Sequence, residues 1–383
     1  MSKPKKEITF VYTDSVQRQV FEMIAAEASK RGYETRVTDD KFAKCEIGWY
    51  CDHWNPPQFS KFSVIMLHDI TQMYMSWPDI WFHEPWDKYD IGFLPSKIWV
   101  DNWNKCSQLS YTNPRRGVYL TGWPKADRIA HYTDEAKRKD FATQVGLDTS
   151  KRTVLYAPAW ENDHKQDDFV QAMMKLDVNI VVKQYPAEDP SQSANIREMY
   201  ELHKGNPRVV LLDPHTNILD AIAVSDVLVS EESSTMTECV MMGKPAISVS
   251  DWLIPDVTPS RYPSNEYDYV VKTKKKDLTE CVRDVLQHYD EYAKQAQKYS
   301  DEHFANIGRC IPMMLDILDA VIEDREPPQK PLTPRPRVKL SPRRYIRHKL
   351  WTWKFEIAYN YCMRYRPLKF AFWVVYQKLR GRS

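Results

Sequence analysis

Short apolar runs that favour β-strands alternate with helix-forming segments twice along this chain of 383 residues. The first series predicts a helix over residues 16–30, with a capping signal at Asp14, among strands at 7–12, 33–38, 46–50, 63–67, 91–93 and 118–120. The second predicts helices at 167–176, 194–203, 218–223, 235–242 and 278–287 among strands at 153–156, 179–183, 209–212, 226–229 and 246–249. This rhythm is typical of parallel sheets covered by helices. The expected fold class is α/β, with two doubly wound domains that face a cleft.

The predicted organisation has five parts. One α/β domain covers residues 1–132 and another covers 150–298. Residues 299–325 are long enough for a helix that crosses back to pack on the first domain. Repeated prolines predict an extended linker over residues 326–342, because proline blocks both helix and sheet. Residues 343–383 form a basic, aromatic tail.

The charge of the chain is unevenly distributed. In total, 54 Lys and Arg face 52 Asp and Glu, a net charge of +2. Fifteen of those bases and one acid, Glu356, lie beyond residue 327, so the tail end carries +14. The remaining 39 bases and 51 acids give the first 327 residues a charge of −12. An acidic body with a basic arm is therefore expected.

The sequence lacks the motifs of several common dinucleotide-, phosphate- and metal-binding sites. The sequence contains no G-x-G-x-x-G, no P-loop and no Asp-x-Asp, and its seven cysteines form no C-x-x-C pair. Cys45, Cys51 and His53 match no zinc spacing and are expected to be packing residues. We therefore expect no metal and no cofactor. The start of the chain has no apolar stretch of signal-peptide length, so a cytoplasmic location is expected.

The tail has the composition of a membrane-surface element. Ile346, Leu350 and Trp353 fall on one helical stripe, and the apolar run at 368–379 is too short to span a bilayer. Basic and aromatic side chains together favour peripheral binding to an anionic membrane on the inner face of the cell membrane. Packing on the body and stacking on nucleic acid are the alternatives, and we expect no nucleic-acid partner. The residues predicted to bind the membrane are Arg344, Arg347, Trp351, Trp353, Lys354, Trp373, Lys378 and Arg380.

Residues 226–245 carry the strongest signal for a ligand. A strand leads through two glutamates into Ser233, Ser234 and Thr235 at the start of a helix, where backbone N–H groups and hydroxyls favour an anion such as phosphate. Glu238 follows one helical turn later, where a carboxylate can accept hydrogen bonds from ribose hydroxyls. Ser and Thr also cap helices without any ligand, so spacing alone leaves both interpretations open.

This segment resembles the donor-binding motif of the CDP-glycerol glycerophosphotransferase family, in which a strand, a turn rich in serine, a glutamate-bearing helix and G-K-P follow in order. Four further segments are similar to family motifs: LHDIT (67–71), GWPKAD (122–127), VLYAPAW (154–160) and VKQYP (182–186). The resemblance implies a Rossmann-like pair of domains of the GT-B type, with an acceptor-side first domain and a nucleotide-donor second domain. It also implies a CDP-activated polyol-phosphate donor, metal-independent transfer and attachment to the membrane.

Site roles follow from the same resemblance. His68 is similar to the family's general base, and Asp69 would orient it. The implied donor-binding residues are Trp160, Lys183, Gln184, Tyr185, Glu232, Ser233, Ser234, Thr235 and Glu238. The acceptor would be a lipid-linked or polymeric cell-surface glycan.

Three departures from the family pattern keep other functions open. Tyr185 replaces a histidine, Glu231 and Glu232 replace Asp-Tyr, and Asp69 replaces a glycine. A nucleotide-sugar glycosyltransferase of the same fold in envelope polysaccharide synthesis is therefore one alternative. A non-catalytic membrane adaptor with a vestigial nucleotide site is another.

Overall fold

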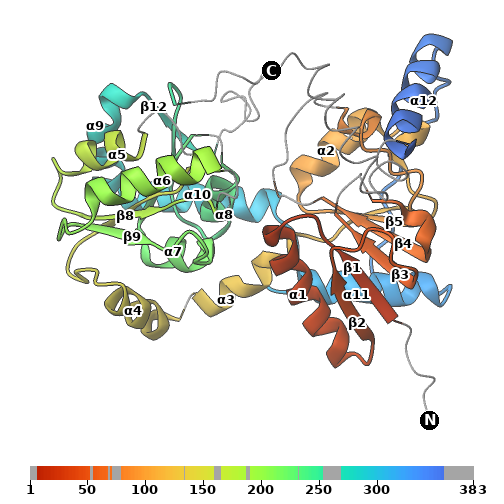
Figure 1. Ribbon diagram of the computed structural model, residues 1–383, viewed down its shortest axis with the longest axis horizontal. Coiled ribbons are helices and arrows are strands. Elements are labelled where there is room, and N and C mark those ends of the chain that lie inside the picture. The colour runs from red at the N-terminus through yellow and green to blue at the C-terminus, as the bar shows by residue number, and fades with distance from the viewer. Residues whose placement is uncertain are drawn as a thin grey trace. The chain divides into compact units, whose positions relative to one another are not determined.

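The computed structural model describes residues 7–51, 55–67, 70, 79–132, 134–158, 165–186, 190–231, 233–252 and 269–357. The chain divides into two compact units (Figure 1). Of the described residues, the first unit combines those up to Leu67 with 79–124 and 310–357, and the second combines Ile70 with those between 125 and 309. The division falls directly after Gly122-Trp123-Pro124, where the first strand series ends.

The first unit is a six-stranded parallel sheet in the order β2-β1-β3-β4-β5-β6. Its strands are β1 (Glu7–Val11), β2 (Glu34–Thr38), β3 (Cys45–Tyr50), β4 (Ser60–Met66), β5 (Ile91–Leu94) and β6 (Val118–Leu120). Its helices are α1 (Ser15–Lys30), α2 (Lys97–Cys106), α11 (Cys310–Ile322) and α12 (Pro342–Ile357), with short 3-10 turns η1 (Pro57–Phe59), η2 (Ile80–Phe82) and η3 (Ser110–Thr112).

The second unit is also a six-stranded parallel sheet, in the order β12-β11-β10-β7-β8-β9. Its strands are β7 (Thr153–Tyr156), β8 (Asn179–Lys183), β9 (Val209–Leu212), β10 (Val227–Ser230), β11 (Ala246–Val249) and β12 (Val271–Thr273). Its helices are α3 (Ile129–Tyr132), α4 (Glu135–Gln144), α5 (Lys165–Met173), α6 (Pro190–His203), α7 (Ile218–Val224), α8 (Thr235–Met241), α9 (Leu278–Gln287) and α10 (Tyr289–His303). The 3-10 turns η4 (Pro124–Arg128) and η5 (Lys275–Asp277) complete it. Both sheets confirm the predicted α/β class with two doubly wound domains.

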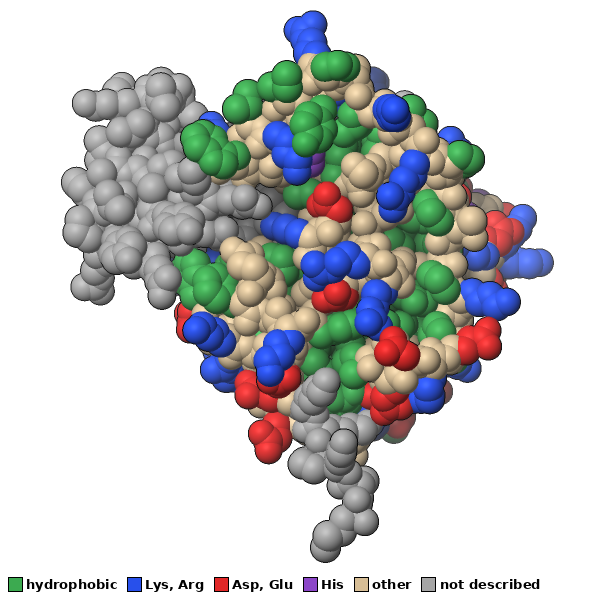
Figure 2. Space-filling model, turned by 90° about the vertical axis from the view of Figure 1, so that its right-hand side faces the viewer, with side chains coloured by type: hydrophobic (Ala, Val, Ile, Leu, Met, Phe, Trp, Pro, Cys, Tyr) green, Lys and Arg blue, Asp and Glu red, His purple; other side chains and the backbone are tan. Residues whose placement is uncertain are grey.

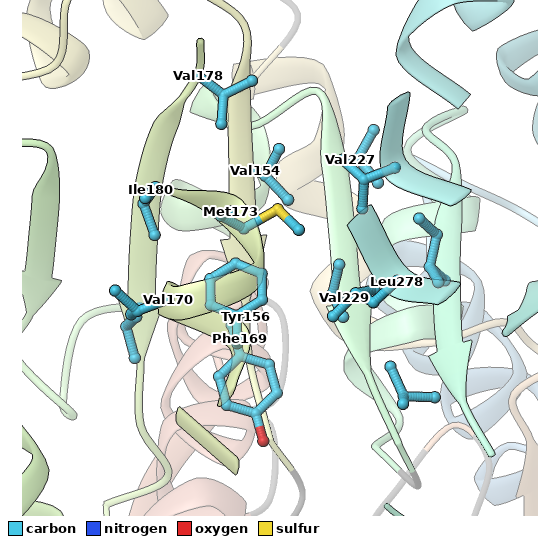
Figure 3. Close-up of a cluster of buried hydrophobic side chains, with 14 of the residues drawn as sticks. Val154, Tyr156, Phe169, Val170, Met173, Val178, Ile180, Val227, Val229 and Leu278 are labelled. Carbon is cyan, nitrogen blue, oxygen red and sulfur yellow. The ribbon is translucent and has the colours of Figure 1, made fainter. Parts of the chain in front are cut away.

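Local sequence explains where the elements begin. Asp14 caps α1, and its side chain accepts a hydrogen bond from the backbone N–H of Gln17 at 2.8 Å. Strands such as β7 and β10 are buried along their whole length, which is why they read as continuous apolar runs rather than as alternating ones. In the second unit, valine and isoleucine from the strands pack against Phe169, Val170 and Met173 of α5 (Figure 3).

Residues 299–325 differ from the single helix that the sequence predicts. α10 ends at His303 and α11 begins at Cys310. Between them, Asn306 and Gly308 adopt left-handed backbone conformations with φ of 56° and 83°, which interrupt a helix. α11 belongs to the first unit, where Asp316 pairs with Arg31 beyond the end of α1 at 2.6 Å.

The proline-rich segment is extended, but it is not a free spacer. The backbone N–H of Leu332 donates to the carbonyl of Val118 in the edge strand β6 at 2.8 Å, and that of Val338 donates to the carbonyl of Gln108 at 3.0 Å. Leu332 and Leu340 also pack against the core of the first unit. The segment therefore covers an otherwise open sheet edge.

Helix α12 is held on the first unit by one polar and aromatic face. Arg344 pairs with Asp79 and donates to the hydroxyl of Tyr111 at 3.0 Å. The ring of His348 is buried and stacks on Tyr111 with 4.4 Å between centroids. Trp351 donates from Nε1 to the carbonyl of His83 at 3.4 Å. Arg344 and Trp351 were predicted to bind the membrane; in the structure they contact the body instead, because both lie on the helix face opposite the apolar stripe.

The other face of α12 is open. Four large hydrophobic side chains there are between 51% and 61% exposed: Tyr345, Ile346, Leu350 and Trp353. Arg343, Lys349 and Lys354 are exposed among them, whereas the guanidinium of Arg347 lies over the ring of Phe82, 5.7 Å from its centroid. Figure 2 shows hydrophobic and basic side chains gathered at the top of the molecule, where α12 lies. Among the described helices, none has the length and apolar character needed to cross a bilayer.

Candidate functional site

The second sheet reverses its winding direction between β7 and β10. From β7 the chain proceeds outward to β8 and β9, then returns to the other side of β7 as β10. Ligands of doubly wound sheets bind at the carboxyl ends of the strands at such a reversal. Here the two strand ends are joined by side chains, because Ser230 donates to the carbonyl of Ala157 at 2.6 Å and Thr235 donates to the same oxygen at 3.4 Å.

The serine-rich turn forms the predicted strand-to-helix connection after β10. Its helix, α8, is only seven residues long. The Ser233 hydroxyl accepts the backbone N–H of Thr235 at 3.3 Å, and the Thr235 hydroxyl is bonded to Ala157. Ser234 precedes the helix and makes no side-chain capping bond. Two of the three predicted hydroxyls are thus engaged with the protein backbone, as the capping interpretation expects.

Glu238 is held by a lysine that sequence reasoning did not assign. The Lys125 ammonium lies 3.0 Å from Oε1 of Glu238, and the two side chains are only 16% and 3% exposed. Lys125 belongs to η4 and is the lysine of the GWPKAD motif, so the signal for it was present in the sequence. The predicted ribose ligand is therefore one half of a buried ion pair.

Lys183 places a second cation beside this pair. It is the last residue of β8, and its Nζ donates to the carbonyl of Gln184 at 3.2 Å and to that of Pro214 at 2.9 Å. Burial, and then the neighbouring charge of Lys125, lower the pKa of Lys183 to about 8, against the opposing effect of Glu238 and Asp213. At neutral pH most Lys183 side chains remain charged.

Lys125, Lys183 and Glu238 form what we call the lysine–glutamate cluster. Its members come from η4, from the end of β8 and from α8, all within the second unit. The cluster carries one more positive than negative charge at the sheet edge where ligands bind, which suits an anionic ligand with additional hydroxyl donors.

The other two residues of the predicted Lys183-Gln184-Tyr185 triplet have separate environments. Gln184 is fully buried and continues the face of Ile180 and Val182, which pack in the core. Neither polar atom of its amide has a hydrogen-bond partner in the described part of the chain. Tyr185 is 39% exposed. Only Lys183 of the triplet joins the cluster.

The sequence matches the family described as CDP-Glycerol:Poly(glycerophosphate) glycerophosphotransferase over residues 81–306, more than half of the chain. The chain belongs to this family. It is accordingly a transferase, and the suspected membership of this family is confirmed.

Solved structures agree on the GT-B-like fold of this glycerophosphotransferase. The wall teichoic acid polymerase TagF, in a variant with CDPG, covers 84% of this chain and 90% of its own at 14% identity and a TM-score of 0.60. A putative UDP-N-acetylglucosamine 2-epimerase from Listeria monocytogenes covers 86% and 100% at 13% identity and a TM-score of 0.57. S. aureus MnaA with UDP covers 86% and 100% at 11% identity and a TM-score of 0.60. No curated protein sequence gives a significant match.

The lysine of the G-K-P motif has a structural task in this glycerophosphotransferase. Lys244 donates from Nζ to the carbonyls of Ile222, Ala223 and Ser225 at 2.6–2.8 Å. These carbonyl oxygens lie at the C-terminal end of α7, where the helix dipole favours a cation. Burial lowers the pKa of Lys244 to about 8. It stabilises the chain that leads into β10 and does not join the cluster.

Seven predicted site residues lie outside the described residues: His68, Asp69, Trp160, Glu232, Trp373, Lys378 and Arg380. Their roles remain predictions from the sequence.

Proposed function

We propose that this protein transfers a glycerol-phosphate, or related polyol-phosphate, group from a CDP-activated donor to a hydroxyl of a lipid-linked or polymeric cell-surface glycan. Family membership supports the class of donor and acceptor. The observation that carries the proposal within this chain is the lysine–glutamate cluster at the reversal of the second sheet.

The cluster suits the two ends of a nucleoside diphosphate. The ammonium groups of Lys125 and Lys183 attract the phosphates, and the carboxylate of Glu238 accepts hydrogen bonds from ribose hydroxyls. In the transfer, the acceptor oxygen forms a bond to the distal phosphorus, the bond from that phosphorus to the bridging oxygen breaks, and CMP leaves with the electron pair. The two lysines stabilise the charge that develops on the departing phosphate. His68, assigned from the sequence, takes the proton of the acceptor hydroxyl.

A donor panel tests this function. The full chain is incubated with CDP-glycerol, CDP-ribitol and UDP-linked sugars in the presence of a short lipid-diphosphate acceptor, and the products are identified by mass. We expect a mass increase of one or more polyol-phosphate units from a CDP-linked donor. Transfer from a UDP-sugar alone would overturn the donor assignment in favour of a glycosyltransferase, and nucleotide binding without any product would favour the adaptor alternative.

We also propose that α12 lies on an anionic membrane surface and brings the enzyme to its acceptor. Its open face combines exposed apolar side chains with the basic residues Arg343, Lys349 and Lys354, the combination that favours partition to the interface of anionic bilayers. The opposite face is fastened to the first unit through Arg344, His348 and Trp351, so the open face is the one available to lipid.

Point variants test the membrane face better than truncation. Removing the chain after Glu326 would also strip Leu332 from β6 and confound the result. We expect Leu350→Asp to reduce sedimentation with phosphatidylglycerol vesicles several-fold. The matched control is Leu202→Asp on α6, because Leu202 and Leu350 are 58% and 59% exposed. Equal binding by both variants would contradict the proposal, and salt-sensitive retention on DNA would favour a nucleic-acid partner.

A further inference from the structure

The buried pair of Lys125 and Glu238 occupies the groups that a nucleotide would use. Both side chains are largely shielded from water, and their charged atoms lie 3.0 Å apart. A buried ion pair resists separation, because each partner would be left as an uncompensated charge in a medium of low polarity. A ligand that engages only one of the two charges must leave the other without a partner.

A nucleoside diphosphate can replace both partners at once. Its vicinal ribose hydroxyls donate to a carboxylate, and its phosphate oxygens accept from an ammonium group. Lys183 supplies a fixed second cation, because its Nζ donates to the carbonyls of Gln184 and Pro214, and it lies near enough to Lys125 and Glu238 for their charges to shift its pKa. Lys125 is less constrained: within the described part of the chain, the partner of its Nζ is the Glu238 carboxylate at 3.0 Å.

We infer that Lys125 exchanges partners when the donor binds: it leaves Glu238, whose carboxylate passes to the ribose hydroxyls, and moves onto the diphosphate beside Lys183. This inference rests on the proposed function only in assuming that the cluster holds a nucleotide. The exchange makes the site selective. A nucleoside without phosphates gives Glu238 a new partner but leaves Lys125 without one, and a diphosphate without a ribose does the reverse. Lys125 is thus a specificity-determining residue for nucleoside diphosphates.

Two variants with opposite expected effects test the exchange. Affinities for cytidine, inorganic diphosphate and CDP are measured by calorimetry on the full chain. In Lys125→Met, Glu238 is already free, so we expect cytidine to bind about tenfold more tightly and diphosphate about tenfold more weakly than to the wild type. In Glu238→Gln, Lys125 is free, so diphosphate should bind more tightly and cytidine more weakly. CDP should bind more weakly to both.

Lys151→Met is the matched control. Lys151 also pairs with a carboxylate of the second unit, Asp177, but at the surface and before the start of β7. All three affinities should be unchanged in this variant. If Lys125→Met and Glu238→Gln weaken the three ligands by the same factor, Lys125 is a structural partner of Glu238 and the exchange is wrong. If one variant fails to fold, the other decides, since each predicts one tighter and one weaker ligand.

The result separates the inference from the proposed function. One outcome is that CDP fails to bind while UDP binds, with uridine and diphosphate each bound more tightly by one variant and more weakly by the other. In that case the assignment to CDP is wrong and the exchange of partners is supported. Should CDP, UDP, GDP and ADP all fail to bind the wild type, both are overturned.

Discussion

The two sheets of this protein have the same number of parallel strands but are wound differently. In the second unit, β8 and β9 lie on one side of β7, and the return to β10 places the reversal in the middle of the sheet. In the first unit only β2 lies beyond β1, so the reversal between β1 and β3 falls near an edge. A central reversal surrounds the ligand site with more strand ends, and the lysine–glutamate cluster combines Lys183 at the end of β8 with Lys125 of η4 and Glu238 of α8.

The cores of the two units differ as well. The first is rich in aromatic residues, among them Trp81, Trp86 and Trp99, which meet edge to face. The second is mainly aliphatic. The aromatic core extends to the platform on which His348 and other residues of α12 rest, through Phe82 and Tyr111. We conclude that the first unit holds a helix on its surface, whereas the second holds a buried cluster of charges beside the reversal of its sheet.

Core truncations should show the largest effects and test this division directly. Trp81→Ala and Phe169→Ala each remove a fully buried ring, one from each core, and should each lower the free energy of unfolding by about 3–5 kcal/mol. Trp81→Ala should also release α12, and Phe169→Ala should not. Denaturant unfolding combined with hydrogen exchange of residues 342–357 measures both. Release of α12 by Phe169→Ala would contradict the conclusion that only the core of the first unit holds this helix.

Removal of the Lys183 ammonium should lower activity more than stability, although it also leaves the carbonyls of Gln184 and Pro214 without their donor. Lys183→Met should slow transfer about 10²–10³-fold, the range for the loss of one preorganised donor. Lys244→Met, in contrast, leaves three carbonyls of α7 without their cation and should lower the melting temperature first. The two lysines are a matched pair because burial lowers the pKa of both to about 8. Equal loss of stability in the two variants would show that Lys183 is structural.

Donor affinity should fall as pH rises through about 8, where free Lys183 loses its proton. The phosphates favour the ammonium form, so binding above this pH must take up a proton and weakens by up to about tenfold per pH unit. Calorimetry between about pH 7 and about pH 9.5 measures the slope. The Lys183→Met variant provides the reference, because its affinity should lack this step.

The smallest effect is expected at the α12 contact. His348→Ala removes the bond to the Phe82 carbonyl at 3.0 Å and the stacking on Tyr111, a loss of about 1–2 kcal/mol. Proteolysis within residues 342–357 should accelerate, while nucleotide affinity stays constant. An unchanged cleavage rate would mean that Arg344 and Trp351 suffice to hold the helix.

Much of the architecture follows from local pattern. The predicted bounds of β6, β7, β8, β9, β11 and α9 agree with the structure. These elements are buried apolar runs or an amphipathic helix, so side-chain periodicity and the adjoining turn residues define them. Helices α2 and α10 escaped prediction, since polar residues interrupt the face that each helix buries, Asn102 in α2 and Ser300 in α10.

The sequence by itself determined the fold class, the two strand series, the family motifs and the basic character of the tail, because each depends on residues close together along the chain. Only the tertiary structure decided that Glu238 meets Lys125, which is 113 positions away, and that Arg344 and Trp351 turn toward the body. Strand order and helix docking decide such contacts, and both emerge only when the whole chain has packed.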